Sequence, residues 1–396
     1  MEAIFSEWLN LILRWAHITT AIAWIGSSFF FNWLDSRIEA PEDGDDKIEG
    51  SLWLVHGGGF YNMTKIQLAP DELPTTLHWV KWEAAFAWIT GFFLLVLMYY
   101  AGASVYLMPA VPTGLGIGGT IAVGLGTMIV SWVLYDLLWN SKFAAGSPRL
   151  AVLICFLAMV FIAWALPFAM SDRAAYLHVG VVLGTLMVAN VWMRIIPPQR
   201  EMVEAMKTGG TPKRGSAVQA KFRSTHNNYM TLPVLFIMVS GHYASTYGNE
   251  YSWAILALIA VSGASVRHYF NLRNKGKASR GLWFVAAGIV GMLVLLAFWT
   301  NQAAMRADAG GEPVAFSEVQ AIIAERCTVC HSATPDRDFV DSAPLGVMFD
   351  TPAQIQAWAA SIQAQAVLAD IMPPGNMTEI TDSERATLGR WIAQGP

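Results

Sequence analysis

Long apolar runs separated by short polar segments occupy the chain from Leu9 to Thr300. Each run is close to the ~20 residues that an α-helix needs to cross ~30 Å of hydrocarbon. Eight runs have this length, at about residues 9–33, 82–101, 115–139, 149–169, 174–196, 229–247, 252–270 and 281–300. The pattern predicts an all-α fold built on an eight-span transmembrane helical bundle.

The polar residues become denser after Arg306, where no run of spanning length follows. We therefore predict a membrane domain over residues 1–300, a linker over 301–311 and a small soluble domain over 312–396. In the soluble domain the spacing predicts one amphipathic helix over residues 316–326. A second is predicted to start at an N-cap-like Thr381, with its apolar residues on one face.

The overall composition agrees with a membrane protein. Hydrophobic residues make up 55% of the 396 residues and charged residues 14%, against a usual charged share of about 25%. The net charge of −4 and the three cysteines give no sign of a nucleic-acid binder or a disulfide-stapled domain. We expect membrane lipid around the chain and no nucleic-acid partner.

Lys and Arg near the ends of the predicted spans are distributed unevenly. The odd-numbered loops hold 17 of them, whereas the N-terminal segment and the even-numbered loops hold Arg173 alone. Cytoplasmic loops carry the excess of Lys and Arg in multi-pass membrane proteins. The odd loops are therefore predicted to be cytoplasmic, and both termini and the soluble domain periplasmic.

The soluble domain contains Cys327-Thr-Val-Cys330-His331, the attachment signature of c-type haem. The two cysteines would form the thioether bonds, and His331 would be one axial ligand of the iron. An isolated C-x-x-C could also be redox-active or bind zinc. Because the histidine follows at once and no second C-x-x-C exists, we predict one covalent haem c.

The second axial ligand is expected to be a methionine, whose thioether raises the haem potential. Met348, Met372 and Met377 are available. Two prolines follow Met372 and would stiffen its approach to the iron, so we predict Met372, with Met377 second. A role in packing alone is the alternative. The domain resembles a small class I cytochrome c.

Polar residues inside the predicted spans are costly and therefore indicate function. His17, His178 and His242 fall in the outer half of the membrane domain and could ligate a second, b-type haem. The alternative is that each histidine forms a local hydrogen bond or lies in the headgroup layer.

A second group of candidates lies at the inner side. His56 is followed by three glycines, which would let the backbone approach a ligand closely. A flexible hinge and an interfacial aromatic belt are the alternatives for this region. The catalytic candidates of the inner side are His56, His78, Glu83, His226 and His268.

The chain as a whole resembles the bacterial membrane-bound, cytochrome-c-linked urate oxidases. The resemblance is carried by His56-Gly-Gly-Gly-Phe-Tyr-Asn, by Leu77-His-Trp-Val-Lys-Trp-Glu, by the eight runs and by the C-terminal C-x-x-C-H. It implies an inner-membrane protein that oxidises urate to 5-hydroxyisourate with water. Two electrons would pass through haem c to an acceptor of the respiratory chain, without hydrogen peroxide. No catalytic residue is transferred from the family.

The chemistry leaves the place of the substrate open. Urate is a planar anion, so its site needs a cation or amide donors, an aromatic platform and a base. From the inner side, electrons must cross most of ~30 Å of bilayer, which would require a second cofactor. An outer site would not. Two other functions compete: a quinol- or other small-molecule-oxidising cytochrome, and a non-catalytic electron-transfer subunit.

Overall fold

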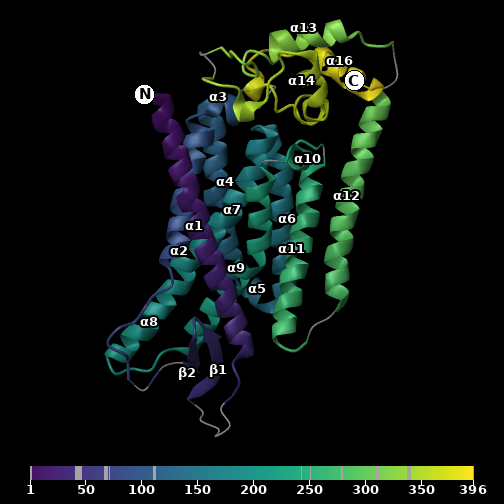
Figure 1. Cartoon of the computed structure of the whole chain (residues 1–396). Coiled ribbons are helices and arrows are strands. Elements are labelled where there is room, and N and C mark those ends of the chain that lie inside the picture. Colours follow the sequence, from purple (N-terminus) through teal and green to yellow (C-terminus); the bar gives the residue numbers. More distant parts are fainter. Residues whose placement is uncertain are drawn as a thin grey trace.

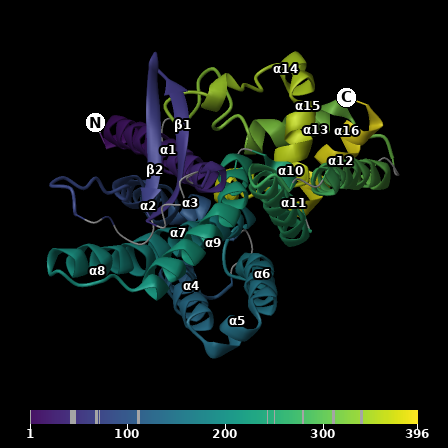
Figure 2. The ribbon, with the colours of Figure 1, turned by 90° about the horizontal axis from the view of Figure 1, so that it is seen from below.

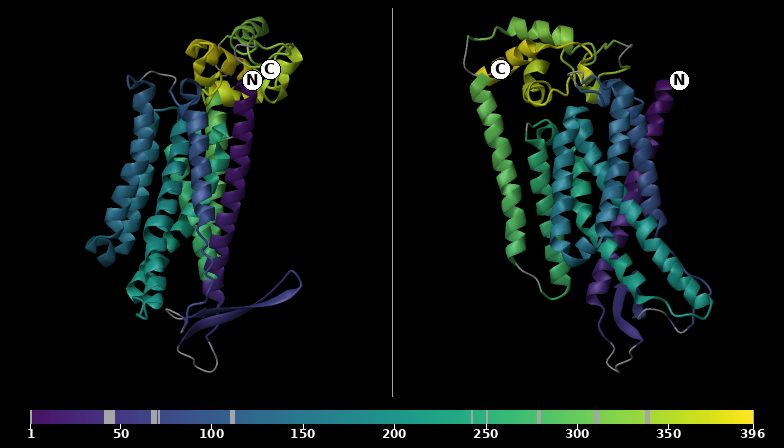
Figure 3. Two further views of the ribbon diagram at one scale, coloured as in Figure 1. Left: turned by 90° about the vertical axis from the view of Figure 1, so that its left-hand side faces the viewer. Right: turned by 180° about the vertical axis from the view of Figure 1, so that it is seen from behind.

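The computed structural model consists of a bundle of long helices and a small helical domain that covers one end of it (Figure 1). The structure describes residues 2–40, 47–66, 70, 72–109, 113–241, 243–249, 251–277, 280–308, 312–336 and 340–395. The N-terminus and the small domain lie at the same end, and a β-hairpin lies at the other (Figure 3). We call these the domain end and the hairpin end.

Each of the eight predicted spans falls on a long helix. The bundle helices are α1 (Glu2–Arg37), α2 (Trp82–Leu95) with its continuation η1 (Val96–Tyr100), α4 (Gly116–Trp139), α6 (Pro148–Ala165), α7 (Asp172–Ala189), α9 (Arg214–Ser240), α11 (Ser252–Asn274) and α12 (Arg280–Asp308). Shorter helical segments join them: α3 (Ala103–Tyr106), α5 (Lys142–Gly146), η2 (Leu166–Phe168), η3 (Asn190–Ile195), α8 (Ile196–Lys207) and α10 (Ala244–Tyr247).

Among the described residues, five helical stretches are both long and apolar enough to cross a membrane. They are Trp82–Tyr100, Gly116–Trp139, Pro148–Phe168, Asp172–Lys207 and Ser252–Asn274. The helices α1 and α9 are longer than a span but more polar, and the described apolar part of α12 covers Arg280–Leu296. The molecule is therefore consistent with a membrane protein.

The centre of the bundle is α7, which has more buried residues than its neighbours and packs against α2, α4 and α9 (Figure 2). Small residues on α7 allow this close packing. A Cβ added to Gly180 would lie 2.7 Å from the side chain of Ile237 on α9. By contrast, large apolar side chains on the outer helices, such as Phe161 and Leu295, are exposed as on a lipid-facing surface.

The all-α prediction is wrong in one region. Strands β1 (Ile48–His56) and β2 (Gly59–Ile66) form an antiparallel hairpin in which His56 is opposite Gly59. Its two-residue turn is Gly57–Gly58, with φ of +59° and +81°. Tight hairpin turns of this kind require positive φ at both central positions, which explains the glycines. The glycine run is therefore a turn rather than a ligand loop.

The C-terminal domain contains the two helices predicted for it. They are α13 (Phe316–Arg326) and α16 (Asp382–Gln394), and the Phe316 and Trp391 rings lie 5.6 Å apart. Thr381 caps α16 in a capping box with Glu384, and Leu388 is fully buried. Short segments lie between these helices: η4 (Pro344–Gly346), α14 (Pro352–Ala357), α15 (Ala359–Ile362), η5 (Gln363–Val367) and η6 (Pro374–Asn376).

The predicted linker is largely helical. Helix α12 continues to Asp308 and so occupies most of the range 301–311. Its sequence there, Asn-Gln-Ala-Ala-Met-Arg-Ala-Asp, is polar enough to look like a linker but rich in strong helix formers. The helix therefore ends at Asp308, beyond residue 300 where the predicted span ends.

Candidate functional site

A cavity of about 690 Å³ opens at the hairpin end of the bundle. Its walls come from α1, the segment before α2, the stretch from α7 to α8, and α9. Sites for small molecules usually have volumes of roughly 300–1,000 Å³. The polar and charged side chains of its lining are Ser27, Ser28, Asn32, Asp35, His78, Lys81, Glu83, Gln199, Ser224, Asn227 and Thr231.

Lys81 is the N-cap residue of α2 and contributes a cation to this lining. Its ammonium lies 5.3 Å from the ring centre of Trp79, 5.5 Å from that of Trp82 and 5.6 Å from that of Trp192. These cation–π contacts hold the ammonium in place. Among the described residues no carboxylate pairs with it, so its charge is available to an anion.

Glu83 lies one helical position beyond Trp82 in the first turn of α2. One of its carboxylate oxygens, Oε2, is buried and has no hydrogen-bond partner. A buried acceptor without a partner is costly and is usually explained by a function or by a missing ligand or water. His78, three residues before Lys81, also lines the cavity.

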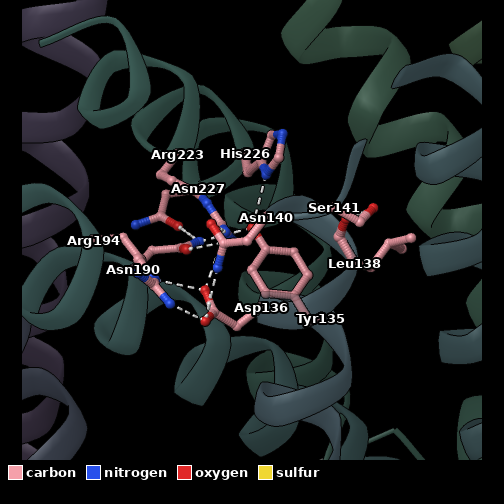
Figure 4. Close-up of polar contacts among 10 residues, drawn as sticks. All are labelled: Tyr135, Asp136, Leu138, Asn140, Ser141, Asn190, Arg194, Arg223, His226 and Asn227. Atoms are coloured by element: carbon pink, nitrogen blue, oxygen red, sulfur yellow. Dashed lines mark hydrogen bonds and ion pairs between the residues drawn. The ribbon is translucent and has the colours of Figure 1, made fainter. Parts of the chain in front are cut away.

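Asn227 connects the cavity wall with a buried polar network between α4, η3 and α9 (Figure 4). Its Oδ1 accepts a hydrogen bond of 2.9 Å from Nδ2 of Asn190, which also lies 2.9 Å from the Tyr135 hydroxyl. That hydroxyl is 2.7 Å from Nδ1 of His226. Asn190 is fully buried and begins the π-helical segment η3, a form often found at functional sites.

The charged part of the network is centred on Asp136. Its carboxylate pairs with Arg194 and, at 3.0 Å, with Arg223. Arg223 is buried, donates a further bond of 3.2 Å to Oδ1 of Asn140 and lies over the ring of Tyr135. Two cations around one carboxylate fix α4 against η3 and α9 in the interior of the bundle.

The opposite side of α9 binds α11. Arg267 donates a hydrogen bond of 2.6 Å to Oδ1 of Asn228, and the Tyr229 hydroxyl lies 2.7 Å from Nδ1 of His268. Neither Arg267 nor His268 lines the cavity. Successive residues of α9 therefore contact different neighbours, which gives this helix a central structural role.

The structure brings together only some of the catalytic candidates predicted at the inner side. His78 and Glu83 both line the cavity, whereas His56 is exposed at the tip of the hairpin. His226 belongs to the buried network beside the cavity and packs against Trp139 at 4.3 Å between ring centres. The glycine run at residues 57–59 does not reach the cavity lining.

Lys81 and Trp192 were not among the predicted site residues. The motif Trp79-Val-Lys81-Trp82, with aromatic residues on both sides of a lysine, was a signal that could have indicated Lys81. Trp192 is more than a hundred residues away in sequence, so its contact with Lys81 follows only from the packing of η3 against α2.

The outer histidines lie at different depths. Nδ1 of His17 donates a hydrogen bond of 2.9 Å to the Ala87 carbonyl oxygen on α2, and the His17 ring packs against Gly91. His178 is fully buried, with Nδ1 2.7 Å from the Ala174 carbonyl oxygen and Nε2 3.1 Å from the Tyr100 hydroxyl.

The surroundings of His17 and of His178 are therefore separate. Tyr100 lies nine residues beyond Gly91 along α2 and η1, which corresponds to about 13 Å along a helix. The structure does not bring His17 and His178 together, and His242 lies outside the described residues.

The C-x-x-C-H segment forms one turn at the end of α13. The His331 amide donates a bond of 2.9 Å to the Cys327 carbonyl, so the two cysteines and the histidine share one side of the turn. Nδ1 of His331 lies 3.0 Å from the Val347 carbonyl oxygen. A bond from Nδ1–H to a carbonyl leaves Nε2 unprotonated, as a metal ligand requires.

Burial raises the pKa of the Cys327 thiol to about 12 and also raises the pKa of the Cys330 thiol, so both thiols are protonated near neutral pH. Among the described residues, no group of three His, Cys, Asp or Glu side chains could hold a metal ion.

Of the three candidate methionines, Met372 has the environment expected of a ligand. Its side chain packs with Cys327 against the core of the C-terminal domain, whereas Met377 is 36% exposed. The Met372 carbonyl accepts a bond of 2.8 Å from the buried Arg385. Met348 is half-buried outside that cluster.

Together, these features define a helical protein with the character of a multi-pass membrane protein, a charged cavity at one end and a C-x-x-C-H domain at the other. Residues 3–301 match the family described as urate oxidase N-terminal. The match covers about three quarters of the chain, which therefore belongs to this family. No curated protein and no solved structure matches the chain.

Proposed function

We propose that this protein oxidises urate to 5-hydroxyisourate and passes the electrons to a respiratory-chain acceptor through a covalent haem c. The urate monoanion and one water give neutral 5-hydroxyisourate, one proton and two electrons. The two electrons go to the respiratory-chain acceptor and not to O2, so no hydrogen peroxide is formed. The single observation that carries the proposal is the family match over residues 3–301, because the family is described as urate oxidase N-terminal.

The cavity supports the choice of substrate. A planar anion needs a cation, an aromatic surface and a proton acceptor, and Lys81, Trp79 and Glu83 supply these in one lining. The walls also offer amide and hydroxyl groups, including those of Asn32 and Thr231, for the oxygen and nitrogen atoms of the ring.

The C-terminal domain fits a c-type haem. Cys327 and Cys330 would hold it covalently, and His331 and Met372 would ligate the iron. The free Nε2 that results from the bond between His331 and Val347 is the observation that supports this fit. When bound, the haem would accept and release single electrons. Arg385 would hold the backbone of the Met372 loop in place.

The proposed route places substrate and haem at opposite ends of the bundle. The distribution of lysines and arginines supports a hairpin end in the cytoplasm and a C-terminal domain in the periplasm of a bacterial inner membrane. Electrons from the cavity must then cross most of ~30 Å. A b-type haem at the outer histidines His17, His178 and His242 stays a prediction that absorption spectroscopy can test.

The decisive experiment is an anaerobic visible spectrum of the purified, oxidised protein before and after adding urate, with a pyridine haemochrome assay on the same sample. The proposal expects urate alone to reduce a c-type haem. Reduction by dithionite but not by urate would reject it. Reduction by a quinol would then favour a quinol-oxidising cytochrome, and reduction by neither substrate a non-catalytic electron-transfer subunit.

A further inference from the structure

We infer that the cavity at the hairpin end is the binding site for the purine anion, with Lys81 as its charge partner, Trp79 as its aromatic surface and Glu83 as the proton acceptor. This assignment rests on the proposed function and adds to it the place of the substrate and the role of each residue. It is carried by three features of the lining.

The first feature is an unpaired cation at a fixed position. Lys81 contacts three tryptophan rings at 5.3–5.6 Å and has no carboxylate partner among the described residues. The other lysines nearby are used differently. Lys65 and Lys221 both pair with Asp35, at 2.9 and 3.2 Å. Lys81 is therefore the cation of this lining that can bind a purine anion.

The second feature is the aromatic wall beside that cation. Trp79 lines the cavity, whereas Trp82 is 54% exposed and does not. A purine ring on Trp79 would gain stacking and apolar burial while its negative edge contacts the ammonium. Aromatic residues around a lysine also form interfacial anchors in membrane proteins, but an anchor does not require the ring to face a cavity.

The third feature is the carboxylate with a free buried oxygen. Glu83 follows Lys81 by two residues, and its Oε2 has no hydrogen-bond partner in the structure. Oxidation of the urate monoanion with addition of water to the ring releases one proton. The Glu83 carboxylate is close in sequence to Lys81, the residue that would bind the anion, and would accept that proton. The electrons would leave to the haem.

The wall opposite these residues is rigid. Asn227 faces the cavity, but its amide is already bonded to Asn190 at 2.9 Å and to the Met187 carbonyl at 2.9 Å. The buried network of Figure 4 thus holds one side of the cavity in place. A rigid wall gives the site a fixed width for a planar ligand, which lowers the entropy lost on binding.

The test is equilibrium dialysis of labelled urate against the full-length protein after dithionite reduction without oxygen, so that urate binds but is not turned over. Lys81→Gln should raise Kd about tenfold or more, because a charged contact is lost. Lys81→Arg should restore most of the affinity. Lys277→Gln, an exposed lysine away from the cavity, should behave as the wild type.

Three further variants keep the test decisive if Lys81→Gln does not fold. Trp79→Ala should weaken binding, whereas Trp53→Ala, at an exposed position outside the cavity lining, should have little effect. Glu83→Gln should bind urate normally but lower kcat with an unchanged KM, because it removes the proton acceptor and not the charge partner.

The outcomes separate the site from the function. If the wild type binds no urate, the proposed function fails. If the wild type binds urate and the Lys81→Gln and Trp79→Ala variants bind it equally well, the cavity assignment is overturned, and Lys81 is an interfacial anchor. Weaker binding only for the Lys81→Gln and Trp79→Ala variants supports the assignment.

Discussion

Gly375 lies directly against Ser104 at the contact between the C-terminal domain and α3. A Cβ added to Gly375 would be 2.7 Å from the Ser104 carbonyl oxygen and 3.0 Å from Cα of Val105. Close by in the same loop, Ala369 and Ile371 pack against the core of the bundle. The loop that carries the candidate ligand Met372 is therefore also the surface that docks on the membrane domain.

We predict that Gly375→Ala loosens this docking. The change should increase hydrogen–deuterium exchange across residues 369–375, because the new methyl group overlaps backbone that cannot move aside. Gly346→Ala is the matched control: Gly346 has a similar positive φ, but nothing lies within 4 Å of its added Cβ. Equal exchange in the two variants would show that the close approach does not hold the domain.

Replacing Met372 by Ala should lower the reduction potential of the haem, because a thioether ligand raises it. Met377→Ala, at an exposed position of the same region, should leave the potential unchanged. A spectroelectrochemical titration measures both values. An unaltered potential in the Met372 variant would transfer the ligand role to Met377 or Met348.

His78→Ala should raise KM for urate about two- to tenfold, as expected for the loss of one hydrogen bond to the ligand. His56→Ala should leave KM unchanged, because His56 lies at the hairpin tip, away from the cavity. Steady-state assays with an artificial electron acceptor distinguish the two. A larger effect from His56 would place the substrate at the glycine turn.

Asp136→Asn should destabilise the protein by about 3–5 kcal/mol, because it leaves the buried Arg223 without its counter-charge. Arg194→Gln should cost less, since the Arg194 side chain is 40% exposed and can be solvated. Thermal unfolding of both variants in one detergent provides the comparison. A smaller loss for Asp136→Asn than for Arg194→Gln would show that the network does not depend on this carboxylate.

The sequence predicted the long helices because an apolar run of spanning length has few structural alternatives. It missed the hairpin because three glycines after His56 suggest a ligand loop as readily as a turn. The choice depends on backbone angles at Gly57 and Gly58, which composition does not reveal. The end of α12 was misplaced for a similar reason, since polar residues can extend a helix beyond the membrane.

The candidate site was predictable only where its residues are neighbours in sequence. His78 and Glu83 are five residues apart and appear together in the cavity. Asn190 and His226 come from different helices, and Tyr135 links them only through the packing of three helices. Tertiary contacts of this kind carry no short-range signal.

The continuation of α12 to Asp308 limits how far the C-terminal domain can travel. Residue 312 is four residues beyond the end of this helix, so the two positions can lie at most about 14 Å apart. A domain released from α3 would remain within a small volume above the bundle, at an effective concentration in the millimolar range typical of short tethers. Re-docking would then outcompete most diffusing partners, so the electron acceptor of the proposed function would have to come to the docked domain.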